Sequence, residues 1–258
     1  MPTINVRGAS LSYLEIGEGI HNAVFLHGNL QSGSIWQGFM SGMPEEFHCY
    51  AFDFRGFGDS SKTAGGVFID SLADDIRYAL HLIGIQRCSV LAFAEGARVA
   101  QSLAARYPSL VYKLVLMGAD GFTTDTAAAI SQANELETIE WRPDAISRIL
   151  KTTLGFPRNR KVSDELIESA VSASQPAAVS FARSVSSGDT LELLPHITAR
   201  TLIVRGEKDQ VATNADSELL KSRIPVCETV ELPNARRLPT QTDLEAYRTA
   251  SLRMLQSM

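Results

Sequence analysis

Short, mostly apolar runs alternate with segments of helical periodicity along the chain, and this alternation constrains its fold more than any other feature. A strand that is apolar at nearly every position is buried on both faces, as in a parallel sheet whose connections are helices. The sequence therefore predicts an α/β fold with a mostly parallel, doubly wound sheet. The runs lie at residues 23–26, 49–52, 88–93, 114–117 and 201–204.

The segment from residue 122 to residue 188 contains no such run. Pro143 and Pro176 suit the first turn of a helix, and Ser163 suits an N-cap. We therefore predict a helical cap at 122–188, inserted between two strands of an α/β core at 1–121 and 189–258. The helical patterns of the cap fall at residues 127–136, 143–150, 163–173 and 176–185.

Local signals at the start of the core predict two further elements. Residues 3–6 and 10–16 alternate weakly around Arg7-Gly8, which predicts an opening antiparallel hairpin. Ser71 and Asp74 form a plausible capping pair for a helix that Gly84 ends.

Composition excludes several classes of protein. A net charge of -5 argues against a nucleic-acid binder, which normally carries a basic face. No apolar run approaches the roughly 20 residues of a membrane span, and the N-terminal residues do not resemble a signal segment. Three cysteines without C-x-x-C spacing predict reduced thiols in a cytoplasmic protein, with no metal site. We expect a small-molecule ligand or substrate and leave the oligomeric state open.

Residues 89–97 have the layout of a nucleophile elbow. Small residues at Ala92, Gly96 and Ala97 bracket a tight bend between a buried strand and a helix. Such a bend forces one side chain onto the top of the sheet. Here the residue at the apex is Ala94, which has no nucleophilic atom.

Other chemically distinctive residues also follow predicted strands. The sequence His-Gly-Asn at 27–29, Ala94, Asp209 and Arg237 all come directly after apolar runs. The working loops of a doubly wound sheet lie at the carboxyl ends of its strands. We therefore expect these residues to meet in one crevice under the cap.

These motifs resemble the α/β-hydrolase fold family over nearly the whole chain. Residues 27–29 look like its oxyanion-hole loop, and Asp-Phe-Arg-Gly-Phe-Gly-Asp-Ser at 53–60 is similar to its D-x-R-G-x-G-x-S loop. Residues 92–96 align with its G-x-S-x-G elbow, 206–209 with the loop of the triad acid, and 232–237 with its L-P-x-A-G-H segment. The resemblance implies an α/β-hydrolase fold with the chain order nucleophile, acid, histidine.

Two departures from the family pattern change the implied chemistry. Ala94 stands at the nucleophile position and Arg237 at the histidine position, and only Asp209 of the triad remains. A methyl group cannot attack a carbonyl, and arginine stays protonated in proteins, so it cannot act as a base. The backbone N–H groups of Asn29 and Glu95 are still expected to form an oxyanion hole.

The sequence thus favours an enzyme that uses no covalent intermediate and no cofactor. Oxyanion N–H groups with Arg237 and Asp209 suit a small anionic or enolisable carbonyl compound. The candidate reactions are cyclisation, isomerisation, dehydration and decarboxylation. Two alternatives remain open: a catalytically silent protein that binds a ligand or partner, and a serine hydrolase with an engineered Ser-to-Ala change.

Further candidates are assigned to substrate binding, each with a structural alternative. Trp36, Trp141 and Arg142 are expected to line the cavity, although an aromatic side chain beside a helix is commonly part of the core. Asp120 is expected to reach the pocket or to cap the first turn of the cap segment.

Two residues near the predicted triad, Arg237 and Glu95, also allow two interpretations, whereas His27 is assigned one. Arg237 has the alternative of a structural salt bridge with Asp209. Glu95 either stabilises the start of a helix or transfers protons. His27 is predicted to brace its loop through hydrogen bonds.

Overall fold

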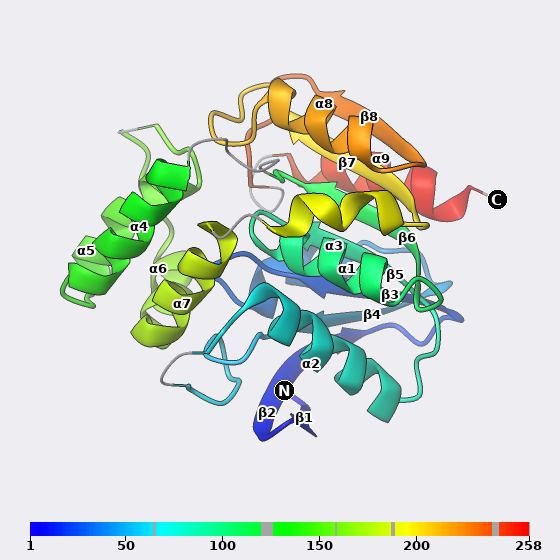
Figure 1. Ribbon diagram of the computed structural model, residues 1–258, viewed down its shortest axis with the longest axis horizontal. Helices are drawn as coiled ribbons and strands as arrows, with labels where there is room; N and C mark the ends of the chain where they lie inside the picture. The colour runs from blue at the N-terminus through cyan, green and yellow to red at the C-terminus, as the bar shows by residue number, and fades with distance from the viewer. Residues whose placement is uncertain (64–65, 120–125, 158, 187–188, 239–242, 258) are drawn as a thin grey trace.

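The computed structural model describes all residues except 64–65, 120–125, 158, 187–188, 239–242 and 258 (Figure 1). The described residues form an eight-stranded sheet in the order β1-β2-β4-β3-β5-β6-β7-β8. Its strands are β1 Thr3–Val6, β2 Ala9–Ile16, β3 His21–Leu26, β4 Phe47–Phe52, β5 Cys88–Phe93, β6 Val111–Met117, β7 Arg200–Gly206 and β8 Cys227–Leu232.

The strand pairing confirms the predicted doubly wound sheet. β1 pairs antiparallel with β2, and β2 pairs antiparallel with β4. The pairs β4–β3, β3–β5, β5–β6, β6–β7 and β7–β8 are all parallel. The predicted opening hairpin is also present, with Arg7 and Gly8 both at positive φ in its turn. The loops that follow β3, β5, β6, β7 and β8 therefore leave the sheet at one edge.

Some helices cover the sheet, and others form a separate group beside it. Figure 1 shows α4, α5, α6 and α7 gathered together on one side of the molecule, between β6 and β7 in the chain. The boundaries predicted for the cap, residues 122 and 188, lie outside the described residues, so the division into two units stays a prediction. The helices are η1 Gly33–Trp36, α1 Gln37–Met40, α2 Ile69–Leu82, α3 Gly96–Arg106, α4 Thr126–Thr138, α5 Pro143–Thr153, α6 Asp164–Ser172, α7 Gln175–Ser186, η2 Asp189–Glu192, η3 Leu194–His196, α8 Asn214–Arg223 and α9 Leu244–Gln256. Within the described part of the chain, none of these helices combines the length and apolar character needed to cross a membrane.

The start of α2 differs from the prediction. Its N-cap is Phe68, and Ser71 lies one turn inside the helix, where its hydroxyl accepts from the Phe68 N–H at 3.0 Å. Asp74 faces α3 instead of capping α2, and it pairs with Arg106 at 2.8 Å. Gly84 follows α2 at positive φ, as predicted for a helix end.

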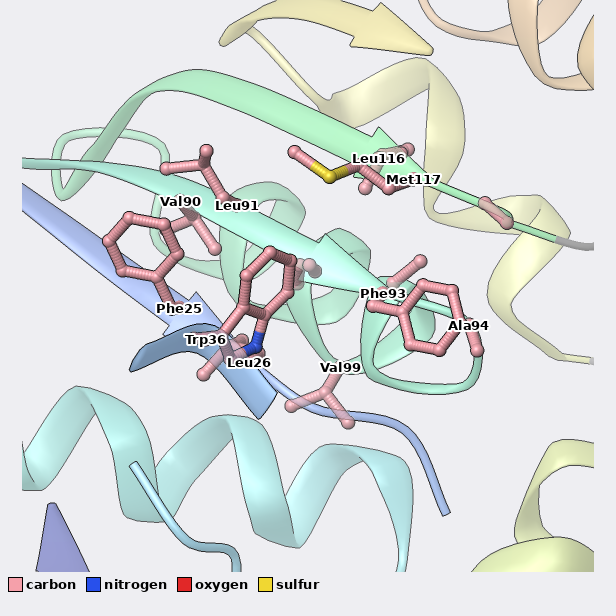
Figure 2. Packing of buried hydrophobic residues seen from close by; sticks show 14 of the residues in the cluster. Phe25, Leu26, Trp36, Val90, Leu91, Phe93, Ala94, Val99, Leu116 and Met117 are labelled. Carbon is pink, nitrogen blue, oxygen red and sulfur yellow. The ribbon is translucent and has the colours of Figure 1, made fainter. Parts of the chain in front are cut away.

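The core is built from the apolar faces of the central strands. Phe25, Val90 and Leu91 are fully buried, and Figure 2 shows them packed together with Leu116 and Met117. All three cysteines are free thiols, as predicted, and Cys49 and Cys88 are buried in β4 and β5.

Asp53 organises the loop at 53–60 that carries the most specific sequence motif. Its Oδ1 accepts from the Gly33 N–H at 2.6 Å, and its Oδ2 accepts from the Asp59 N–H at 2.8 Å. Burial raises the pKa of Asp53, and these two N–H donors oppose that rise. The carboxylate therefore joins its own loop to the start of η1.

Gly58 is required by this arrangement. It has a φ of +48°, and a Cβ there would lie 2.2 Å from Cγ of Asp53. We expect Gly58→Ala to lower the free energy of unfolding by about 2–4 kcal/mol, through left-handed strain and overpacking together. Gly84→Ala is the matched control because Gly84 has a φ of +84° and no atom within 4 Å of its Cβ position. Urea unfolding that shows equal losses for both variants would contradict the role of Asp53.

Candidate active site

The predicted elbow is formed at the end of β5, with a methyl group at its apex. Ala94 has a φ of 51°, in the left-handed backbone region that residues other than glycine seldom adopt. Its N–H donates to the Met117 carbonyl at 3.0 Å, and its carbonyl accepts from the Ala97 N–H at 2.9 Å. A Cβ at Gly96 would lie 2.3 Å from the His27 carbonyl oxygen, so the loop after β3 packs directly on the start of α3. The strained turn therefore persists without a nucleophile.

His27 braces this arrangement through both ring nitrogens, which confirms the role predicted for it. Its Nε2 accepts from the Phe54 N–H at 3.0 Å, and its Nδ1 lies 2.7 Å from the Gly28 carbonyl. Burial lowers the pKa of His27 to about 4. The ring is therefore neutral at pH 7, with its proton on Nδ1, and it ties the 27–29 loop to the 53–60 loop.

Asp209 and Arg237 form a buried pair at the ends of β7 and β8. Arg237 Nη1 lies 3.9 Å from Asp209 Oδ1, and the two side chains are 2% and 0% exposed. Asp209 Oδ1 also accepts from the N–H groups of Val211 at 2.8 Å and Ala212 at 3.0 Å. Burial raises the pKa of Asp209, and the Arg237 charge and these N–H donors oppose the rise.

The guanidinium of Arg237 points into the protein and reaches the elbow strand. Its central carbon lies 5.8 Å from the ring centroid of Phe93, the residue that precedes Ala94. The Cβ position of Gly118, just after β6, is 3.1 Å from both Arg237 Cγ and Phe93 Cε2. The ends of β5, β6, β7 and β8 thus meet around this buried side chain. The crevice under the cap in which residues 27–29, Ala94, Asp209 and Arg237 were expected to meet stays a prediction.

The N–H of Asn29, predicted as an oxyanion donor, is bound to a carboxylate of the chain itself. It donates to Glu95 Oε2 at 3.0 Å. The Asn29 side chain is also engaged, because its Nδ2 donates to the Ala178 carbonyl in α7 at 3.0 Å and its Oδ1 accepts from the Leu30 N–H at 3.0 Å. In this conformation Asn29 therefore links the elbow to a helix of the predicted cap.

Tyr247 in α9 is a residue of the site that sequence reasoning missed. Its hydroxyl donates to the Arg236 carbonyl at 2.6 Å, and the side chain is fully buried. Burial raises its pKa, and the Asp209 charge adds to the rise. The phenol therefore fixes the backbone that carries Arg237. An aromatic residue in a terminal helix gives no sequence signal for this contact.

Two of the predicted substrate-binding residues make other contacts. Trp36 is fully buried in the core, beside Phe25 (Figure 2). Its ring centroid lies 5.3 Å from that of Phe25 and 5.7 Å from that of Phe39. Arg142 has a side chain that is 57% exposed, and it pairs with Glu140 and Asp144, each at 3.0 Å. Trp36 is thus part of the core, which was the alternative stated for it, and Arg142 forms ion pairs at the surface.

The remaining two substrate-binding predictions have different outcomes. Trp141 is partly buried, and its Nε1 donates to the Val171 carbonyl of α6 at 3.0 Å. Asp120 lies outside the described residues.

Three cavities formed by described residues lie among the helices. One of about 610 Å³ separates η1 and α1 from α6, one of about 500 Å³ lies beside α7, and one of about 420 Å³ lies between α5 and α6. None of these three is lined by Ala94, Asp209 or Arg237. In the part of the chain described, no cluster of three or more His, Cys, Asp or Glu side chains is arranged to hold a metal ion.

Several known proteins are similar to this chain in sequence or in structure. Serine hydrolase BPHL of Mus musculus is 26% identical over 86% of this chain and 74% of its own length. 3-Oxoadipate enol-lactonase 2 of Acinetobacter baylyi is 23% identical over 96% of this chain and 94% of its own length. A hydrolase from Pseudomonas aeruginosa superposes with a TM-score of 0.88 at 22% identity, covering 99% of this chain and 98% of that chain.

An enol-lactonase from Burkholderia xenovorans superposes with a TM-score of 0.85 at 19% identity, covering 99% of this chain and 100% of that chain. A sequence model of the alpha/beta hydrolase fold family matches residues 24–185, which include the loops after β3, β4 and β5. The chain belongs to the α/β-hydrolase fold family.

Proposed function

We propose that this protein is a non-hydrolytic enzyme that acts on a small enolisable carbonyl compound bearing a carboxylate. It works without a covalent intermediate, in a cyclisation, isomerisation, dehydration or decarboxylation. The observation that carries the proposal is the elbow: its strained backbone is kept at Ala94, with a φ of 51°, although the side chain there is a methyl group. Strain of this kind persists only where the surrounding structure holds it, and it gathers at functional sites.

The residues at the triad positions exclude acyl transfer but suit the stabilisation of negative charge. Ala94 cannot attack, and Arg237 cannot accept a proton. A guanidinium offers a fixed fork of donors for a carboxylate or an enolate, and its attraction is stronger in a water-excluded site. Arg237 lies in such a site beside Asp209. A relative in the family is named as an enol-lactonase, which supports a small carboxylate-bearing substrate.

A second candidate function, ligand binding without turnover, rests on a different observation. Two of the three predicted anion-binding groups contact carboxylates of the chain: the Asn29 N–H binds Glu95, and Arg237 lies 3.9 Å from Asp209. A ligand must therefore compete with these carboxylates. A member of the family that binds a ligand without turning it over would need only the binding step.

Two assays on the purified protein test the proposal. A fluorophosphonate probe is expected to leave the protein unlabelled, and p-nitrophenyl acetate is expected to hydrolyse at the buffer rate. Levulinate, a small ketone with a carboxylate, is expected to bind and to exchange its α-protons in D₂O, as followed by proton NMR. Pentanoate, which lacks the ketone, is the control for binding without exchange.

The role of Arg237 is tested with a variant that keeps its charge. Arg237→Lys is expected to weaken levulinate binding by about 10-fold or more because a single ammonium cannot reproduce the bidentate fork. Arg142→Lys is the matched control at the surface and is expected to bind as the wild type does. Binding without exchange by the wild type supports the second candidate, and absence of both binding and exchange contradicts the proposal.

A further inference from the structure

We propose that the carboxylate of Glu95 is the group that moves the proton in this reaction. The inference rests on the proposed function and adds the residue that takes the place of the missing base. Glu95 directly follows the elbow apex and is the N-cap of the 11-residue helix α3.

The Glu95 carboxylate lies beside the loop that follows β3 and close to the elbow apex. The point that a Cβ of Gly28 would occupy is 2.7 Å from Glu95 Oε2 and 3.1 Å from Ala94 Cβ. The same Oε2 accepts from the Asn29 N–H, the predicted oxyanion donor, at 3.0 Å. The Glu95 carboxylate oxygen and the apex methyl therefore both lie close to Gly28, and the oxygen is held there by the predicted oxyanion donor.

The other described groups around the elbow are unsuited to proton transfer. Arg237 stays protonated, and Ala94 has no exchangeable side-chain proton. His27 uses Nε2 to accept from Phe54 and Nδ1 at the Gly28 carbonyl, so both nitrogens are engaged in bracing. Asp209 has a fully buried side chain, and its Oδ1 is bound to two backbone N–H groups.

Glu95 differs from Asp209 in its access to a ligand. Glu95 is partly exposed, whereas the side chains of Asp209 and Arg237 are 0% and 2% exposed. The N–H of Asn29 and the positive end of α3 both stabilise the ionised form of a carboxylate. Glu95 is thus held by contacts that suit a carboxylate and, unlike Asp209 and Arg237, it is partly open to the solvent.

The proton-transfer step uses no oxidant, reductant or cofactor. A Glu95 oxygen takes the proton from the carbon next to the ketone: the C–H bond breaks, an O–H bond forms, and the electron pair stays on the substrate as an enolate. The negative charge passes from the Glu95 carboxylate to the enolate, so the net charge of the site is unchanged. Return of a proton from Glu95 to the enolate carbon regenerates the carboxylate. In D₂O the carboxyl proton exchanges with solvent, so a deuteron is returned.

Glu95→Gln tests this step because the amide keeps the size and the accepting oxygen of the side chain but cannot take the proton. General acid–base groups contribute about 10²–10⁴-fold, so we expect α-proton exchange of levulinate to fall by about 100-fold or more. The dissociation constant of levulinate is expected to stay within about threefold of the wild-type value, which separates the chemical step from binding. Glu95→Asp is expected to retain part of the exchange, and Glu18→Gln, at an exposed loop position, all of it.

The pH profile adds a readout that a structural role would not change. Wild-type exchange is expected to fall on acidification as Glu95 becomes protonated, and the residual exchange of Glu95→Gln is expected to lack this fall. Wild-type exchange rates in Glu95→Gln overturn the inference and leave the proposed function intact. A parallel loss of levulinate binding and of thermal stability in Glu95→Gln assigns Glu95 a structural role and also overturns it. Absence of exchange in the wild type removes the proposed function together with the inference.

Discussion

Arg237→Met is expected to lower the free energy of unfolding by about 3–5 kcal/mol at pH 7. Removal of one partner of a buried ion pair leaves the other charge uncompensated, and this costs about that much. The partner is Asp209, 3.9 Å away, with a side chain that is 0% exposed. Methionine fills much of the volume of arginine, so the loss reports the missing charge more than a cavity.

Urea unfolding of matched variants separates the pair from its surroundings. Arg237→Met combined with Asp209→Asn is expected to recover a large part of the loss because the buried negative charge is then also removed. Arg142→Met is the control for a surface arginine, since its ion pairs with Glu140 and Asp144 are exposed and contribute at most about 1 kcal/mol. A loss below about 1 kcal/mol for Arg237→Met would mean that water reaches Asp209.

The pH dependence of this loss follows from the direction of the Asp209 shift. Burial raises the pKa of Asp209 in the folded protein, and the Arg237 charge is the largest cause that opposes the rise. In Arg237→Met the folded-state pKa therefore rises further above its unfolded value. A carboxyl with a raised folded-state pKa contributes stability below the unfolded pKa and loses it as the pH rises through the folded-state pKa. The deficit of the variant should thus be smallest below about pH 4 and grow towards pH 7.

The elements that the sequence predicts well are those specified by local pattern. The strand predicted at 88–93 coincides with β5 Cys88–Phe93, and the helix predicted at 143–150, with Pro143 in its first turn, is α5 Pro143–Thr153. A parallel strand buried on both faces and a helix bounded by Pro or Gly each carry their limits in their own residues. The elbow likewise depends on small neighbours, so its backbone survives replacement of the apex residue.

The contacts that the sequence did not reveal join residues distant in the chain. Glu95 meets the Asn29 N–H across 66 positions, and no local pattern indicates that a carboxylate will occupy a predicted oxyanion donor. Trp36 shows the same limit, since the same helical position suits a core residue and a pocket residue. The N-cap of α2 was missed because the Phe68 backbone is satisfied by Ser71 from inside the helix. Tertiary packing, rather than local preference, decides each case.

Introducing serine and histidine together, at the positions where the sequence predicts the nucleophile and the base, is expected to produce a hydrolase, whereas either one alone is not. Loss of the nucleophile or of the base in the subtilisin triad costs about a million-fold, and loss of the second adds little. Ala94→Ser and Arg237→His as single variants should therefore hydrolyse p-nitrophenyl acetate at the wild-type background rate. Together they place a hydroxyl on the strained elbow and an imidazole beside Asp209, and we expect at least about 100-fold more hydrolysis.

The Asn29 N–H, the predicted oxyanion donor, limits how much hydrolysis the double variant can gain. Glu95 Oε2 binds the Asn29 N–H, so the double variant begins with that donor engaged. A single oxyanion donor is worth about 10²–10³-fold in turnover. Adding Glu95→Ala to Ala94→Ser and Arg237→His should therefore raise hydrolysis by about another 100-fold. Asp209→Asn in the same background should abolish the gain, since the imidazole then loses the carboxylate that orients it. If Ala94→Ser alone hydrolysed p-nitrophenyl acetate as fast as the triple variant, the chain would be a serine hydrolase that lacks only its hydroxyl. Arg237 would then not be the reason why the wild type fails to hydrolyse this ester.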